Sequence, residues 1–184
     1  MSQEPQRLVT ATREIAAPAA AIFELIADPA QQPRWDGNDN LDQAAPGQRV
    51  NAVGDVFVMR NRNGGVRENH VVDFAEGRAI AWLPAPQGEA PPGHLWGWQL
   101  EPTDGGTLVT HLYDYTRLYD EKRLPKAQAM TSEKLLASID RLAALAEEDG
   151  QSCRPPHRRG TRLTLGEHLP FAPLVRVDRA RGDT

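Results

Sequence analysis

The stretch that most constrains the fold is residues 94–116, HLWGWQLEPTDGGTLVTHLYDYT, which predicts two strands joined by a glycine-containing turn. Successive side chains of a strand point to opposite faces of the sheet. One face would then carry His94, Trp96, Trp98 and Leu100 from the first strand and Val109, His111, Tyr113 and Tyr115 from the second. Such an aromatic face either packs solidly or lines a pocket with an aromatic body and polar tips.

The first 36 residues predict a strand followed by two short helices. Alternating β-branched and polar residues favour a strand over 7–15. An apolar stripe at helical spacing within 19–28 predicts a helix that Pro29 ends. A second helical turn follows and ends on Trp35, a large aromatic residue placed to plug a cavity mouth or a core edge.

The middle of the chain predicts further antiparallel strands. Residues 37–47 are polar and loop-like, and strand character follows over 48–62 with an interruption at 53–55. Asn63-Gly64-Gly65 is a hairpin turn signal, and 66–75 form the return strand. Neither face of this return strand is cleanly apolar, so its register stays open and a bulge is one alternative.

Three further segments complete the predicted sheet and its cover. Residues 79–83 predict another strand, whereas 84–93 hold four prolines and two glycines and predict a surface connection or a lid, not a strand. From 126 to 149, apolar residues recur at helical spacing, which predicts one helix of about 33 Å. The apolar positions of this helix are Leu135, Ile139, Leu142 and Ala146.

The order of these elements predicts an α+β fold. We expect a curved antiparallel sheet of about seven strands wrapped around a long C-terminal helix, with two short helices after the first strand. Residues 1–149 would form this domain, and 150–184 an Arg/Pro-rich C-terminal extension that is largely disordered or draped over the surface.

Charge separates the two parts. Residues 150–184 carry seven arginines and three acidic side chains, whereas the whole chain carries −4, which leaves −8 for residues 1–149. An acidic domain argues against nucleic-acid binding there. The basic extension is expected to be a solvated tail, with contact to nucleic acid, anionic lipid or a partner protein as alternatives.

Cysteine usage and hydropathy narrow the class further. Cys153 is the only cysteine, so no intrachain disulfide can form, and Cys153 with His157 supplies only two ligands for a metal. We therefore predict no metal and no cofactor. No run of about 18 apolar residues and no signal-peptide pattern occur, so we predict a protein of the reducing cytoplasm without a transmembrane segment.

Several short motifs together resemble the helix-grip, START-like superfamily (SRPBCC), in its polyketide cyclase/dehydrase branch. They lie in order over residues 7–149: Ile15–Pro18, Ile22-Phe23, Ile26–Pro29, Trp35, Val53–Asp55 with Phe57 and Asn61, Trp96–Pro102 and Gly106–Thr110, before the last helix. The resemblance implies a hydrophobic pocket between sheet and helix for lipids, sterols, polyketides or hormone-like molecules. A minority of members are cyclases or aromatases, and the superfamily has no universal catalytic motif.

The candidate site follows from the inward faces and the resemblance together. The predicted function is binding of a small hydrophobic or aromatic molecule. The alternative is that the same aromatic residues only pack the core. The expected ligand-binding residues are Trp35, Phe57, Met59, Asn61, Trp82, Trp96, Trp98, His111 and Tyr113.

An enzymatic alternative is a cyclase or dehydratase, which needs a base beside a carbonyl and a donor for the enolate oxygen. His111 is the best acid or base, with the hydroxyl of Tyr113 or Tyr115 as donor. Same-face neighbours on a strand lie only about 7 Å apart. A third alternative is an interaction module in which residues 150–184 dock a partner.

Overall fold

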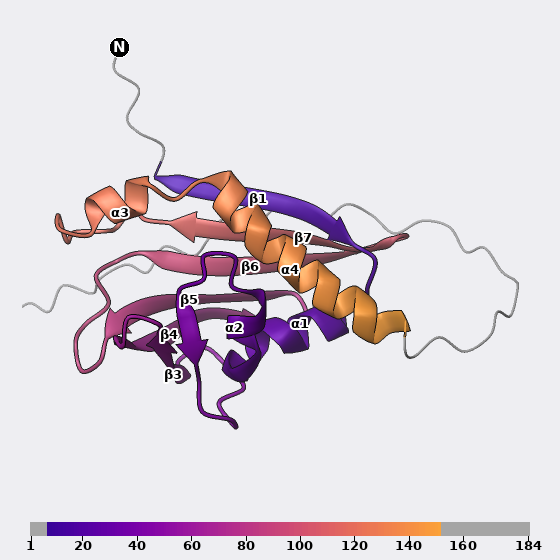
Figure 1. Ribbon diagram of the computed structural model, residues 1–184, viewed down its shortest axis with the longest axis horizontal. Helices are drawn as coiled ribbons and strands as arrows, with labels where there is room; N and C mark the ends of the chain where they lie inside the picture. Colours follow the sequence, from indigo (N-terminus) through magenta and orange to yellow (C-terminus); the bar gives the residue numbers. More distant parts are fainter. Residues whose placement is uncertain (1–6, 152–184) are drawn as a thin grey trace, which may run out of the picture. The chain divides into compact units, whose positions relative to one another are not determined.

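The computed structural model describes residues 7–151, and their strands form one seven-stranded sheet (Figure 1). The sheet has the order β1-β7-β6-β5-β4-β3-β2, and every neighbouring pair is antiparallel. The strands are β1 (Leu8–Ile15), β2 (Leu41–Gln43), β3 (Val56–Asn61), β4 (Val66–Ala75), β5 (Ala79–Pro86), β6 (Leu95–Thr103) and β7 (Gly106–Asp114).

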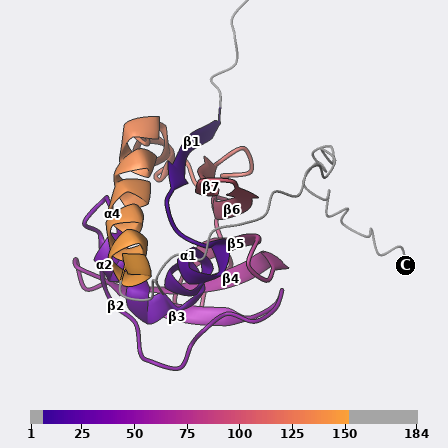
Figure 2. The ribbon, with the colours of Figure 1, turned by 90° about the vertical axis from the view of Figure 1, so that its right-hand side faces the viewer.

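The helices are α1 (Ala19–Ala27), the 3₁₀ turn η1 (Pro29–Gln31), α2 (Gln32–Trp35), α3 (Leu124–Gln128) and α4 (Ser132–Gln151). Figure 2 shows the sheet curving from β1 round to β3, with α4 lying across its open side. The predicted α+β helix-grip fold is therefore confirmed, and so are β1 and the short helices after it. The predicted extension 150–184 lies almost entirely outside the described residues.

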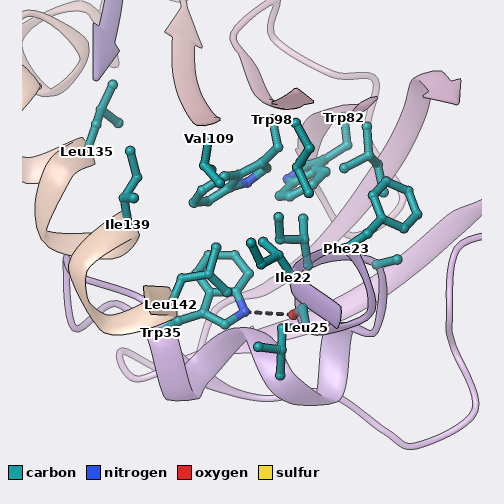
Figure 3. Close-up of a cluster of buried hydrophobic side chains, with 14 of the residues drawn as sticks. Ile22, Phe23, Leu25, Trp35, Trp82, Trp98, Val109, Leu135, Ile139 and Leu142 are labelled. Carbon is teal, nitrogen blue, oxygen red and sulfur yellow. Dashed lines mark hydrogen bonds between the residues drawn. The ribbon is translucent and has the colours of Figure 1, made fainter. Parts of the chain in front are cut away.

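Helix α1 ends in a fully bonded C-terminus that fixes the position of Trp35. The last four carbonyls of a helix have no partner within it. In α1 the Asp28 N–H bonds Glu24 O in the last helical turn, and the Val50 N–H bonds Ala27 O. The Trp35 indole N–H donates to Leu25 O at 2.7 Å (Figure 3), and Gln32 Nε2 donates to Ile26 O at 3.2 Å. The indole of Trp35 thus caps the C-terminal end of α1, and this bond holds Trp35 at the edge of the core.

Helix α4 packs its apolar stripe onto the core formed by β1, β7 and α1. Leu135, Ile139 and Leu142 are fully buried, as the 3.6-residue spacing predicted. Gly37 lies so close to α4 that an added Cβ would stand 2.4 Å from the Ser138 nitrogen. The Gly37 N–H donates to Ser138 Oγ at 3.0 Å, so the loop after α2 is fixed to α4.

The predicted long helix over 126–149 is confirmed from Ser132 onward as α4, but it does not continue unbroken back to 126. The backbone bonds of α3 end at Ala129 and Met130, and α4 starts afresh where Thr131 O accepts the N–H of Lys134 and of Leu135. The reason is the Thr131-Ser132-Glu133 sequence, because Thr and Ser favour helix starts and an acidic side chain favours the first turn. The break makes α3 a separate short helix.

Strand β4 contains a bulge between Val71 and Asp73, which settles the register left open by the sequence. Val71 pairs with Trp82, and Phe74 pairs with Ile80, although two residues lie between Val71 and Phe74 and only one lies between Ile80 and Trp82. The extra residue explains why neither face of 66–75 alternates cleanly. Residues before and after the bulge both turn apolar side chains inward.

Three further predictions were wrong at strand boundaries. β5 extends through Pro84 and Pro86, although 84–93 was predicted to contain no strand. β6 pairs with β5 only over Ala79–Trp82, so the later part of that edge of β5 is unpaired and needs no N–H from a proline. The predicted loop 37–47 contains β2, and strand structure within 48–62 is confined to β3. Within 7–151, no helix is long and apolar enough to cross a membrane.

Candidate functional site

A cavity of about 580 Å³ lies between the concave face of β3–β7, the loop after α2, α3 and the first part of α4. This volume is in the range of small-molecule sites, roughly 300–1,000 Å³. Eight of the nine predicted site residues line it: Trp35, Met59, Asn61, Trp82, Trp96, Trp98, His111 and Tyr113. Phe57 does not, because it packs edge-to-face on Trp82 with 5.4 Å between ring centroids, within the core.

The aromatic face of β6 and β7 forms one wall of the cavity. Trp96 pairs with Tyr113 and Trp98 with His111 across the two strands, so these four residues share one face, as alternation predicted. The Trp98 and His111 rings stack at 3.7 Å with an interplanar angle of 8°, and the Trp96 and Tyr113 centroids are 4.4 Å apart. Trp98 is fully buried, whereas Trp96 is half-buried, so Trp96 offers the accessible part of this wall.

His111 lies deep in this wall and is held by its backbone partner. Its Nδ1 is 3.0 Å from Gly97 O, and because a carbonyl only accepts, Nδ1 carries the proton and Nε2 is the acceptor. Burial lowers the pKa of His111 to about 4, and the bond to Gly97 opposes this only in part. The ring is therefore neutral at pH 7. Burial also raises the pKa of Tyr113 to about 12, so its hydroxyl stays a donor.

Polar residues meet the aromatic wall from the opposite side. Asn61 and Asn69 are buried on β3 and β4, and Asn69 Nδ2 donates to Phe57 O at 3.4 Å. Asp36 is also buried, but its carboxylate accepts the backbone N–H groups of Asn38, Asn40 and Leu41 and so holds the loop. The asparagines are the polar side chains best placed to orient a ligand.

Sequence reasoning missed a group of basic and imidazole side chains at the mouth: Arg67, His94, Arg123, Lys126 and Lys134. Arg67 pairs with Met59, whose side chain lines the cavity, so locating the bulge in β4 would have placed Arg67 on the inner face. His94 was assigned to the correct face but not to the site. Nothing in the spacing of Arg123 and Lys126 pointed to the mouth, because the break before α4 was not foreseen.

Two buried ring nitrogens of the lining have no hydrogen-bond partner within residues 7–151. They are Nδ1 of His94 and Nε1 of Trp98. Buried polar groups are nearly always paired, so these two nitrogens are exceptions within the described chain. The described part of the chain contains no group of three or more His, Cys, Asp or Glu placed to hold a metal ion.

The sequence pattern of the family described as "Polyketide cyclase / dehydrase and lipid transport" matches residues 6–147, and the chain belongs to this family. The predicted resemblance is thereby confirmed. No curated protein sequence matches the chain.

Solved structures show the same fold at low sequence identity. The protein NE0264 from Nitrosomonas europaea superposes with a TM-score of 0.58 at 16% identity, over 80% of this chain and 98% of that one. The protein MLL2253 from Mesorhizobium loti superposes with a TM-score of 0.57 at 18% sequence identity. The match covers 77% of this chain and 98% of MLL2253. DynU16, a protein in the dynemicin biosynthetic locus, superposes with a TM-score of 0.57 at 18% sequence identity. The match covers 80% of this chain and 50% of DynU16. At these identities the likeness concerns the fold.

Proposed function

We propose that the protein binds a small hydrophobic or aromatic molecule in the cavity between the sheet and helices α3 and α4. The observation that carries the proposal is a cavity of about 580 Å³ with a wall of stacked aromatic rings. Burial of apolar ligand area there is worth roughly 25 cal/mol per Å², and offset stacking on Trp96 adds to it. The family description, which includes lipid transport, supports the same role.

The alternative that these aromatic side chains only pack the core applies to some of the predicted site residues. Phe57 has core partners and does not reach the cavity, and Trp98 is fully buried between neighbours. Trp96 and His94 are only partly buried, and both lie on the cavity. The residues proposed to touch the ligand are therefore Trp96, Tyr113 and Asn61, with Trp35 and Met59 at the sides.

Binding can be tested with N-phenyl-1-naphthylamine, a neutral probe whose fluorescence rises in apolar surroundings. We expect saturable binding to the full chain and an affinity lowered on the order of tenfold by Trp96→Ala, which removes the accessible aromatic surface. Phe57→Leu is the matched control, because it changes an inward aromatic residue outside the cavity. No binding, or equal loss in both variants, would refute the proposal. Native mass spectrometry of the purified protein would identify any ligand that co-purifies.

The cyclase or dehydratase alternative has weaker support from the same geometry. The family description includes cyclases, and the Tyr113 hydroxyl is a protonated donor suited to an enolate oxygen. However, a histidine with a pKa of about 4 is a weak base at neutral pH, and its Nδ1 is occupied by Gly97 O. If His111→Ala still binds the probe but no longer turns over a cyclisable polyketide, the protein is a cyclase or dehydratase and binding alone is not its function.

A further inference from the structure

The mouth of the cavity concentrates positive charge in an otherwise acidic domain. Arg67 from β4, Arg123, Lys126 from α3 and Lys134 from α4 line it, against a single lining carboxylate, that of Asp36. The oxygens of Asp36 are already engaged by three backbone N–H groups. Residues 1–149 as a whole carry −8, so this basic cluster is a local exception. A cleft lined by one sign of charge attracts ligands of the opposite sign.

Two of these cations have no counter-ion within the described chain. Arg123 pairs with Asp120 at 2.8 Å, and Lys134 Nζ donates to Ala129 O. No carboxylate among residues 7–151 lies within ion-pair distance of Arg67 or Lys126. Arg67 is half-buried, and among residues 7–151 its guanidinium donates only to the neighbouring Val66 O at 3.0 Å.

The cations lie close enough to act on one another and on His94. Burial lowers the pKa of Arg67, with repulsion from Arg123 adding to it and attraction by Glu89 opposing it. Burial, then Arg123, Arg67 and Lys126, lower the pKa of His94 to about 4. His94 is therefore neutral at pH 7, and its Nδ1 is buried without a partner among the described residues. A ligand anion would relieve this repulsion and supply acceptors.

We propose that the cavity takes an aromatic or hydrophobic carboxylic acid, its carboxylate between Arg67 and Lys126 and its apolar body on Trp96 and Tyr113. This inference rests on the proposed binding function and specifies its ligand class. Charge-assisted hydrogen bonds from Arg are strong and often bidentate, and a partly buried position reduces their screening by salt. His94 lies 6.0 Å from Tyr113 between ring centroids, so it stands where the carboxylate meets the aromatic body.

The test is competition against bound N-phenyl-1-naphthylamine by two compounds of nearly equal shape, 2-naphthoate and 2-naphthamide. We expect the full chain to bind naphthoate on the order of tenfold more tightly than naphthamide at low salt. The reason is that a hydrogen bond to a charged carboxylate contributes more binding free energy than one to a neutral amide. Arg67→Gln should remove most of this preference, and Lys126→Gln part of it. The preference in each variant is calculated relative to that variant's own affinity for the neutral reporter. Arg78→Gln, an exposed site that does not line the cavity, is the control for loss of one charge.

Each outcome decides the question. Equal competition by naphthoate and naphthamide would overturn the carboxylate proposal and leave the binding function standing. A naphthoate preference that survives both Arg67→Gln and Lys126→Gln, or falls equally in Arg78→Gln, would also overturn it. Failure of the neutral reporter to bind the unaltered protein would instead refute the binding function itself. Lys126 is exposed on α3, so its variant tests the proposal even if Arg67→Gln does not fold.

Discussion

Burial of His111 as a neutral ring makes the stability of the domain depend on pH in a calculable way. The pKa of His111 is about 4 in the folded protein and about 6.5 in an unfolded chain. Between these values the unfolded state binds a proton that the folded state does not, so the free energy of unfolding decreases as the pH falls. Stability from the neutral ring is complete above about pH 6.5 and is lost progressively towards pH 4.

The magnitude follows from the same two values. Lowering the pH from about 7.5 to about 5 should cost about 2 kcal/mol through His111 alone. His94 contributes in the same range and with the same sign, because burial also lowers its pKa to about 4. The contribution of His111 is therefore the difference between the wild-type protein and His111→Gln, whose amide can still donate to Gly97 O.

The assay is urea unfolding followed by tryptophan fluorescence at both pH values. The destabilisation caused by His111→Gln should be smaller by about 2 kcal/mol at about pH 5 than at about pH 7.5. Val109→Ala is the control, because it removes buried apolar contact from the same face of β7 without removing a titratable group. A His111→Gln effect that is as constant with pH as that of Val109→Ala would show that the folded ring titrates normally and would refute the reasoning.

Three further predictions concern the frame of the cavity. Trp35→Phe should lower the free energy of unfolding by about 1–3 kcal/mol, because it leaves a carbonyl at the end of α1 unpaired; thermal denaturation measures this. Gly37→Ala should cost about 1–3 kcal/mol by forcing the loop off the α4 backbone, whereas Gly105→Ala should cost less because its Cβ meets only a movable glutamate side chain. Ile139→Ala should cost about 2–5 kcal/mol in urea unfolding, whereas Leu136→Ala on the exposed side of α4 should cost under about 1 kcal/mol; equal losses would contradict the packing described.

The sequence was most informative where one period holds over many residues. The alternation in 94–116 predicted which residues of β6 and β7 share a face, and the helical spacing from Leu135 predicted the buried stripe of α4. These patterns depend on local geometry and on burial of one face, so they can be read without tertiary structure. The aromatic wall of the cavity was therefore predictable.

The basic mouth was not predictable because it depends on irregularities. Arg67 faces inward because it pairs with Met59, but the bulge in β4 puts Phe74 on the same face as Arg67 and Val71, so the inner face of 66–75 does not follow one alternation. The break at Ala129–Thr131 separates α3 from α4 and places Lys126 by the mouth. Phe57 was assigned to the site because it shares a face with Met59. Alternation shows which side chains face inward, but it does not show whether an inward side chain lines the cavity or packs in the core.

The bulge at Val72 has a consequence for how this chain can vary. Removing Val72 would make β4 a regular strand with the same inward residues on both sides of the deletion, since the bulge contains one residue more than its partner strand requires. The extra residue therefore does not decide which side chains of β4 face inward. A bulge bends and twists its strand, so it adds to the curvature of the sheet over the cavity. An insertion or deletion at this position would therefore change the bend of β4 without exchanging the side chains that face inward.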